Sequence, residues 1–163
     1  MKNICDIMKK DSALVGLAGT YFVAAELSQR GYIATVTSRN TEGIDLLASN
    51  INGSKVVSIQ VKTSGARIRE RFSRSWMMQQ KHENVYSDSF FYVFVDLKPN
   101  EKPDFYVVPS KVVADYLKHE HEVWLKTPGR GGKKHNDTTM RLFEINDEKD
   151  IPKYLNRWDL FGL

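Results

Sequence analysis

A pair of short strands joined by a polar turn, within residues 40–62, constrains the fold of this chain more than any other stretch. The turn covers residues 50–55 and contains Asn52-Gly53. This dipeptide favours tight hairpin turns because both residues tolerate a positive φ. We therefore expect the flanking segments to be neighbouring strands of one sheet.

The polar residues of this hairpin occupy defined positions. In the second strand Gln60 and Lys62 share one face, because successive side chains of a strand point to opposite sides. The first strand is a nearly all-apolar run with one carboxylate, Asp45, at its start. The pattern predicts that an acid, an amide and an ammonium converge at one edge of the hairpin. The apolar residues that alternate with the polar ones in the second strand are Val57, Ile59 and Val61.

These groups suit the hydrolysis of a phosphodiester. A hard divalent cation binds oxygen ligands, usually one or two carboxylates together with substrate phosphate and water. We predict that Mg²⁺ or Mn²⁺ binds to Asp45, Gln60 and the main-chain carbonyl of Val61. Lys62 would orient the attacking water or offset the charge that grows on the phosphate, so the catalytic candidates are Asp45, Gln60 and Lys62. The alternative interpretation is a solvated strand face beside an aspartate that caps a turn.

The rest of the pattern predicts a mixed α/β chain in which helices cover a central sheet. A helix begins at Asp11 or Ser12 and continues to about Arg30, with Gly31 as its C-terminal stop. Gly16 and Gly19 weaken its first turns and allow close backbone packing. Further strands are expected at residues 32–37, 90–97, 105–108 and 140–145.

Other segments complete the expected order of helix, three strands, helix and strand. A short helix is expected at residues 76–83, a second helix after Pro109-Ser110, a loop at residues 127–139 and a helix or tail at residues 151–163. Residues 90–97 are apolar throughout, which is typical of a central strand covered on both faces. Trp158, Leu160 and Phe161 either pack on the core or form a dimer contact.

Length and composition indicate a single soluble domain over residues 1–163. The formal charge of +4 is compatible with a polyanionic partner. The single cysteine, Cys5, fits a reducing compartment. With neither a signal peptide nor an apolar run of about 18 residues, we expect a cytoplasmic protein without a membrane segment.

The sequence resembles the PD-(D/E)XK nuclease superfamily, which includes Holliday junction resolvases and many restriction endonucleases. The resemblance rests on Asp45, on Gln60-Val61-Lys62 after a short hairpin, and on a preceding helix that ends at Gly31. It is closer to small prokaryotic members of the superfamily. Segments that match them are residues 19–27, 40–45, 60–63 and 91–95, Trp76-Met77, Lys81-His82-Glu83, Val108-Pro109-Ser110 and Met140-Arg141.

The resemblance implies a restriction endonuclease-like αβββαβ core, with a central mixed sheet flanked by helices, and a magnesium-dependent endodeoxyribonuclease. Two positions depart from the pattern. Thr20 stands where resolvase-like members carry a glutamate in the first helix, and Gln60 stands where many active members have a glutamate. Glu26 does not replace the lost carboxylate, because six residues correspond to about 600° around a helix.

The segment after the hairpin is basic and is expected to bind the phosphates of DNA through Arg67, Arg69, Arg71 and Arg74. A homodimer would supply two sites for cutting both strands of a duplex. Two alternatives stay open. One is a catalytically degenerate module that binds nucleic acid, and the other is a protein-interaction module on the same scaffold. We assign no role to Lys81, His82 and Glu83 beyond support of the site.

Overall fold

The structure is a computed structural model, and it describes residues 12–38, 43–65, 73–98, 100–146 and 148–163. Predictions that concern Cys5, Asp11, Asn40 or Arg67, Arg69 and Arg71 fall outside this part of the chain. In chain order the elements are α1 (Ser12–Gln29), β1 (Ile33–Val36), β2 (Leu46–Ser49), β3 (Val56–Ser64), β4 (Ser73–Gln79), the 3-10 helix η2 (Gln80–Asn84), β5 (Phe90–Asp96), β6 (Asp104–Pro109), α2 (Ser110–Lys126), η3 (Arg130–Gly132), β7 (Met140–Asn146), α3 (Ile151–Tyr154) and η4 (Trp158–Phe161).

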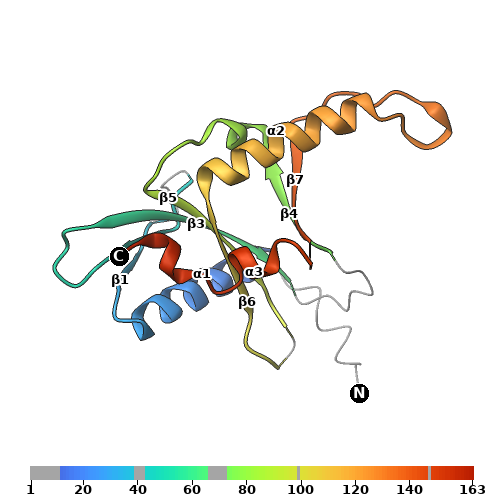
Figure 1. The fold of residues 1–163 in the computed structure, drawn as a ribbon. Helices are drawn as coiled ribbons and strands as arrows, with labels where there is room; N and C mark the ends of the chain where they lie inside the picture. The colour runs from blue at the N-terminus through green and yellow to red at the C-terminus, as the bar shows by residue number, and fades with distance from the viewer. Residues whose placement is uncertain (1–11, 39–42, 66–72, 99, 147) are drawn as a thin grey trace, which may run out of the picture.

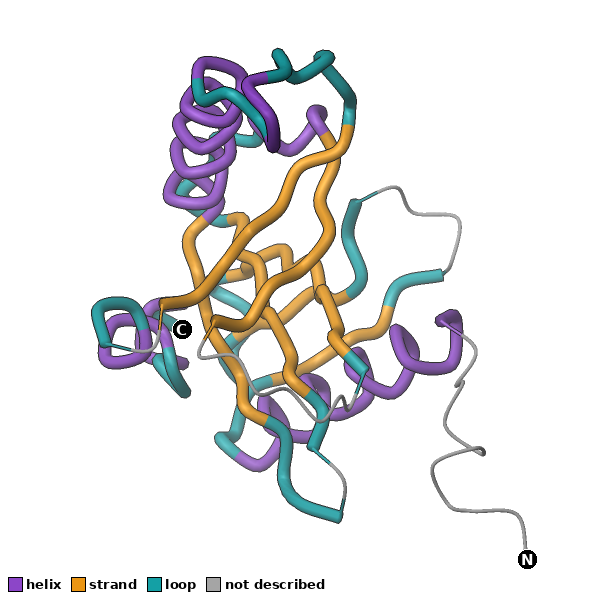
Figure 2. Tube along the Cα trace, turned by 90° about the vertical axis from the view of Figure 1, so that its right-hand side faces the viewer, coloured by secondary structure: helices purple, strands orange, loops and turns teal. Residues whose placement is uncertain are grey.

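The described strands form a five-stranded mixed sheet, in the order β1-β2-β3-β5-β6, and a two-stranded sheet of β4 and β7. Strands β3 and β5 pair in parallel, whereas the other neighbouring strands pair antiparallel. Helix α1 lies on one side of the five-stranded sheet, and α2 lies with the β4–β7 ribbon on the other (Figures 1 and 2). This arrangement confirms the expected mixed α/β class.

The hairpin that anchored the prediction is present. Strands β2 and β3 pair antiparallel, from Ser49 opposite Val56 to Leu46 opposite Ile59. In the turn the Gly53 N–H donates to the Asn50 carbonyl at 3.0 Å, and Gly53 has a φ of +69°. Glycine adopts this left-handed conformation without the steric cost that a Cβ imposes.

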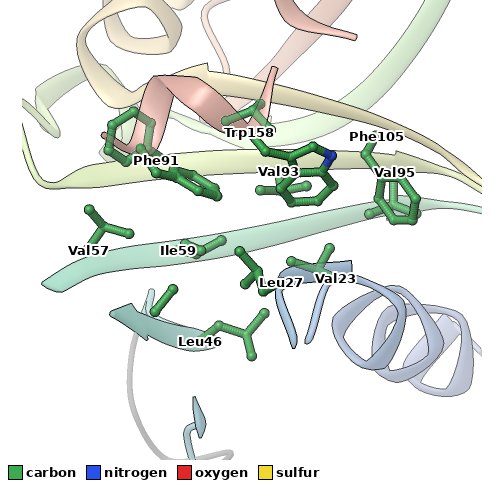
Figure 3. Packing of buried hydrophobic residues seen from close by; sticks show 13 residues of the cluster. Val23, Leu27, Leu46, Val57, Ile59, Phe91, Val93, Val95, Phe105 and Trp158 are labelled. Atoms are coloured by element: carbon green, nitrogen blue, oxygen red, sulfur yellow. The ribbon is translucent and has the colours of Figure 1, made fainter. Parts of the chain in front are cut away.

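Strand β5 divides the core into two layers because its alternate side chains face opposite sides. Phe91, Val93 and Val95 pack with α1 and with residues near the C-terminus, as Figure 3 shows for part of this cluster. Tyr92 and Phe94 pack with α2, β4 and β7 on the other side. All five side chains are at most 5% exposed, so the predicted central strand covered on both faces is confirmed.

The connection between β3 and β5 differs from the prediction. Residues 76–83 were expected to form a helix, but residues 76–79 belong to β4 and only residues 80–83 are helical, in η2. Strand β4 pairs with β7, which places Trp76 opposite Phe143 and buries Trp76 and Met78 while Met77 stays exposed. Pairing with a distant strand therefore outweighs the local helical pattern. The separate helix predicted after Pro109-Ser110 is confirmed as α2.

The C-terminal segment packs on the core. It contains the short helices α3 and η4, which agrees with the expectation of a helix or tail. Trp158 and Phe161 are 4% and 2% exposed, and the ring of Phe161 lies 5.0 Å from that of Phe91. These two aromatic residues therefore complete the layer that holds α1. In the described part of the chain, every helix is too short or too polar to cross a membrane.

Helix α1 lies very close to β3 at Gly19. A Cβ built on Gly19 would lie 1.9 Å from the Thr63 Oγ1 and 2.9 Å from its Cβ, whereas a Cβ on Gly16 would meet nothing within 4 Å. The close packing expected of these two glycines is therefore confirmed for Gly19 alone. The helix ends as predicted, since Gly31 has a φ of +83° and the Tyr32 N–H donates to the Leu27 carbonyl.

We expect Gly19→Ala to destabilise the protein by about 1–3 kcal/mol, because the added methyl group overpacks the contact with Thr63. Gly16→Ala is the matched control, and it should stabilise the protein by about 0.5–1 kcal/mol through the better helix propensity of alanine. Urea unfolding monitored by circular dichroism measures both values. Equal stability of the two variants would contradict the close approach of α1 to β3.

Candidate functional site

The candidate site lies where β3 extends beyond β2. The last pair between these strands is Leu46 with Ile59, whereas β3 continues beside β5 up to the pair of Ser64 with Asp96. Between these two points one edge of β3 no longer pairs with β2. Gln60 and Lys62 both belong to this stretch, and Asp45 directly precedes β2.

Main-chain hydrogen bonds fix Asp45 between two strands. Its N–H donates to the Ile59 carbonyl at 2.9 Å, and its carbonyl accepts a bond from the Thr37 N–H at 3.0 Å. Its side-chain Oδ2 accepts a 2.7 Å bond from the Val61 N–H. The carboxylate therefore takes the place of a missing strand partner, and it lies against the residue between Gln60 and Lys62.

The main-chain carbonyl of Val61 faces the same side as its N–H, because the two groups of one residue point to the same edge of a strand. That edge is the one that Asp45 occupies. The carboxylate of Asp45 and the carbonyl of Val61 are therefore on the same side of β3, as a shared ion would require.

Gln60 carries the most unusual polar group of the site. Its side chain is buried, with 9% exposure, and its Oε1 accepts no hydrogen bond from any described residue. An unsatisfied buried acceptor costs about 1–3 kcal/mol, so such groups require a reason. A role as a cation ligand is one such reason. The oxygen atoms of Asp45, Gln60 and Val61 are the type of ligand that a hard cation binds.

Lys62 is partly buried next to two charged groups. Burial lowers the pKa of its ammonium below the ordinary value, the Asp45 carboxylate opposes this fall, and the Lys81 ammonium adds to it. Asp45 and Lys62 therefore lie close enough to interact electrostatically. The lower pKa weakens the hold of Lys62 on its proton.

The three catalytic candidates meet at β3 but open onto different clefts. Asp45 and Val61 line a cleft of about 510 Å³ together with Thr20 of α1. Gln60 and Lys62 line a cleft of about 300 Å³ on the side of β4 and η2. Neither of these two clefts is lined by all three side chains. Their binding of a common ion stays a prediction.

The departures noted in the sequence fall at this site. Thr20 lines the same cleft as Asp45, and its hydroxyl donates to the Gly16 carbonyl at 3.2 Å. Glu26 is 6% exposed and forms ion pairs with Arg30 at 2.6 Å and Lys102 at 2.7 Å, so it stabilises the fold and does not replace the lost carboxylate. The described residues contain no group of three or more His, Cys, Asp and Glu side chains suited to a metal.

The basic segment contributes little to the described site. Arg74, in β4, forms an ion pair with Asp96 at 3.0 Å and lies 3.8 Å from Asp104. Its charge is already matched within the fold, which does not support the expected phosphate contact. The other three arginines assigned to phosphate binding, Arg67, Arg69 and Arg71, lie outside the described residues.

Two residues next to the site were given no role by the sequence argument. Lys81 and His82, in η2, line the cleft of Gln60 and Lys62. His82 is 4% exposed and its Nδ1 lies 3.0 Å from the Tyr92 hydroxyl. Burial, together with Lys62 and Lys81, lowers the pKa of His82 to about 4, so it is neutral at pH 7. The only signal in the sequence was the match of Lys81-His82-Glu83 to the related subgroup.

Comparison with known proteins supports the fold through structure alone. No protein-family model matches the sequence, and no curated protein matches it. The structure is similar to that of a bacterial homing endonuclease, with a TM-score of 0.56 and 14% identity over 92% of this chain and 90% of the other. A Holliday junction resolvase from Archaeoglobus fulgidus shows a TM-score of 0.49 and 13% identity, over 90% of this chain and 95% of that one. The chain therefore shares its fold with this homing endonuclease, which agrees with the nuclease-like fold that the resemblance in its sequence implied.

Proposed function

We propose that this protein is a metal-dependent nuclease that hydrolyses phosphodiester bonds in DNA. The observation that carries the proposal is the bond from the Val61 N–H to the Asp45 carboxylate, which holds an acid against β3 between Gln60 and Lys62. The fold it shares with a homing endonuclease supports the same reaction class. Fold alone does not determine function, so the residues of the site carry most of the argument.

A divalent cation, Mg²⁺ or Mn²⁺, would be held by the Asp45 carboxylate, the Gln60 Oε1 and the Val61 carbonyl. The unsatisfied Gln60 oxygen supports this assignment. When bound, such a cation polarises a phosphoryl oxygen and lowers the pKa of bound water. With a single carboxylate in the set, we expect weak binding in the absence of DNA, whose phosphate oxygens would complete the coordination shell.

The ammonium of Lys62 would stabilise the charge that develops on the phosphate. Such stabilisation is large where the charged group is fixed before the reaction and partly removed from water. Lys62 meets both conditions, because it belongs to a strand of the central sheet and is partly buried. The lowered pKa of Lys62 also lets it exchange a proton with a bound water more readily than an exposed lysine would.

A second candidate function is DNA binding without cleavage. Thr20 supports it, because a hydroxyl replaces a carboxylate in the cleft that Asp45 lines. The division of the candidate side chains between two clefts also supports it. The nuclease requires a site that binds the cation and is active, whereas a protein that only binds DNA does not.

We expect purified protein to cleave supercoiled plasmid or branched DNA in Mg²⁺ or Mn²⁺. Asp45→Asn and Lys62→Met should each reduce the rate about a hundredfold or more. The first variant weakens the binding of the cation, and the second removes the positive charge that stabilises the transition state. Gel electrophoresis separates nicked from linear plasmid, and linear product without accumulated nicks would indicate the paired sites of a homodimer. Lys126→Met, at the exposed end of α2, is the control and should cleave normally.

Intact DNA with the wild-type protein in both metals would reject the nuclease. If a gel shift nevertheless persists and weakens with salt, the DNA-binding alternative is supported. If there is no shift at any salt concentration, a protein-interaction module becomes the better explanation.

We expect Thr20→Glu to increase the affinity for Mn²⁺ about tenfold, since it restores a carboxylate to the cleft of Asp45. Isothermal titration calorimetry without DNA measures this directly. Thr20→Gln is the matched control, because it adds similar volume without charge. Equal Mn²⁺ affinity in the two variants, or Mn²⁺ binding that survives Asp45→Asn in the Thr20→Glu background, would contradict the assigned site.

A further inference from the structure

The helix η2 brings a second lysine to the cleft at β3. This cleft lies between the edge of the central sheet and the β4–β7 ribbon, and its walls combine polar and apolar side chains. Lys81 also lines a neighbouring cleft of about 270 Å³ that it shares with Gln60. The residues around the first cleft are Gln60, Lys62, Met77, Met78, Gln79, Lys81, His82 and Met140.

The backbone of η2 is fixed from two sides, which gives Lys81 a defined position. On the side of the central sheet, the buried His82 lies within hydrogen-bond distance of the Tyr92 hydroxyl, at 3.0 Å. On the side of the ribbon, Glu83 forms a largely buried ion pair with Arg141, and the Gln80 N–H donates to the Thr139 carbonyl at 2.8 Å. Breaking a buried ion pair is costly, so the turn is held firmly.

The three consecutive residues Lys81, His82 and Glu83 therefore have different environments. His82 and Glu83 make the contacts with Tyr92 and Arg141 described above, and Lys81 is exposed and borders the cleft. The anchored pair thus places the ammonium of Lys81 beside the site.

The charges of this cleft favour an anion. Lys81 and Lys62 both line this cleft, so two ammonium groups border the same space. Two like charges at one cleft repel each other, and a bound anion would offset this repulsion. The same cleft is also lined by Met77 and Met140, which are 57% and 58% exposed. An anion with an apolar neighbour, such as a phosphate attached to a deoxyribose, fits this combination better than a free inorganic ion.

We propose that Lys81 binds a backbone phosphate of DNA in the cleft that it shares with Gln60 and Lys62. This inference rests on the proposed function and adds a substrate contact to it. Lys81 would hold the strand next to the reacting phosphodiester, while Lys62 acts at the reacting phosphate itself. Because Lys81 contacts a phosphate that does not react, it should contribute equally to the substrate complex and to the transition state.

The test measures binding separately from cleavage. Fluorescence anisotropy of a labelled DNA duplex, in EDTA and at several salt concentrations, compares the wild type with Lys81→Met, Lys81→Arg and Lys126→Met. Lys81→Met should weaken binding about tenfold, as expected for the loss of one charge-assisted bond. It should also reduce the slope of log K against log salt by about one. Lys81→Arg keeps the charge and should retain the wild-type slope, as should Lys126→Met.

Cleavage kinetics in Mg²⁺ provide the second measurement. Lys81→Met should raise KM with kcat nearly unchanged, because uniform binding is lost. A wild-type salt slope in Lys81→Met would overturn the phosphate contact, even if the protein cleaves DNA. If the wild type binds DNA but never cleaves it, the nuclease proposal fails. The salt dependence of DNA binding by Lys81→Met then still tests the phosphate contact of Lys81. No binding by the wild type, together with intact DNA in Mg²⁺, would reject both proposals.

Discussion

The hydrogen bond between the Asp45 carboxylate and the Val61 N–H is the interaction on which the candidate site depends. A strand that extends beyond its neighbour leaves backbone groups without a partner, and burying such groups is costly. Here a side chain supplies the missing acceptor. The same bond that completes the edge of β3 fixes the only carboxylate among the predicted metal ligands. Structural need and chemical role therefore coincide at one residue, and removing Asp45 would disturb both.

Much of the fold could be predicted because the signals are local. A few neighbouring residues identify each of these elements. They are the alternation around Gln60 and Lys62, which indicates β3, the Asn52-Gly53 turn before it, and the continuous apolar run of β5. Strand β4 was missed because its partner β7 lies about 65 residues later in the chain, and short-range spacing does not register such pairing. The burial of Trp76 and Met78 on either side of the exposed Met77 is a strand period, but its short length left it ambiguous.

The site was predictable only in part. Alternation correctly placed Gln60 and Lys62 on one face, yet it could not show that Asp45 opens onto a cleft with α1 while they open toward η2. Charge alone suggested that Arg74 contacts DNA, and it could not show that Arg74 lies within ion-pair distance of Asp96 and Asp104, which are distant in sequence. Lys81 was given no role beyond support of the site, because its position depends on partners of His82 and Glu83 in other strands. Tertiary contacts decide each of these cases.

The β4–β7 ribbon has a kinetic consequence. Ser73 pairs with Asn146, so this sheet forms only after two remote parts of the chain meet, and closing such a long loop slows folding. Glu83 also lacks its partner until Arg141 arrives with β7. A chain that has already assembled β1, β2, β3 and α1 would therefore still have an unfinished cleft. The residues of β4, η2 and β7 that line the cleft with Lys62 would then be among the last parts of the molecule to fold.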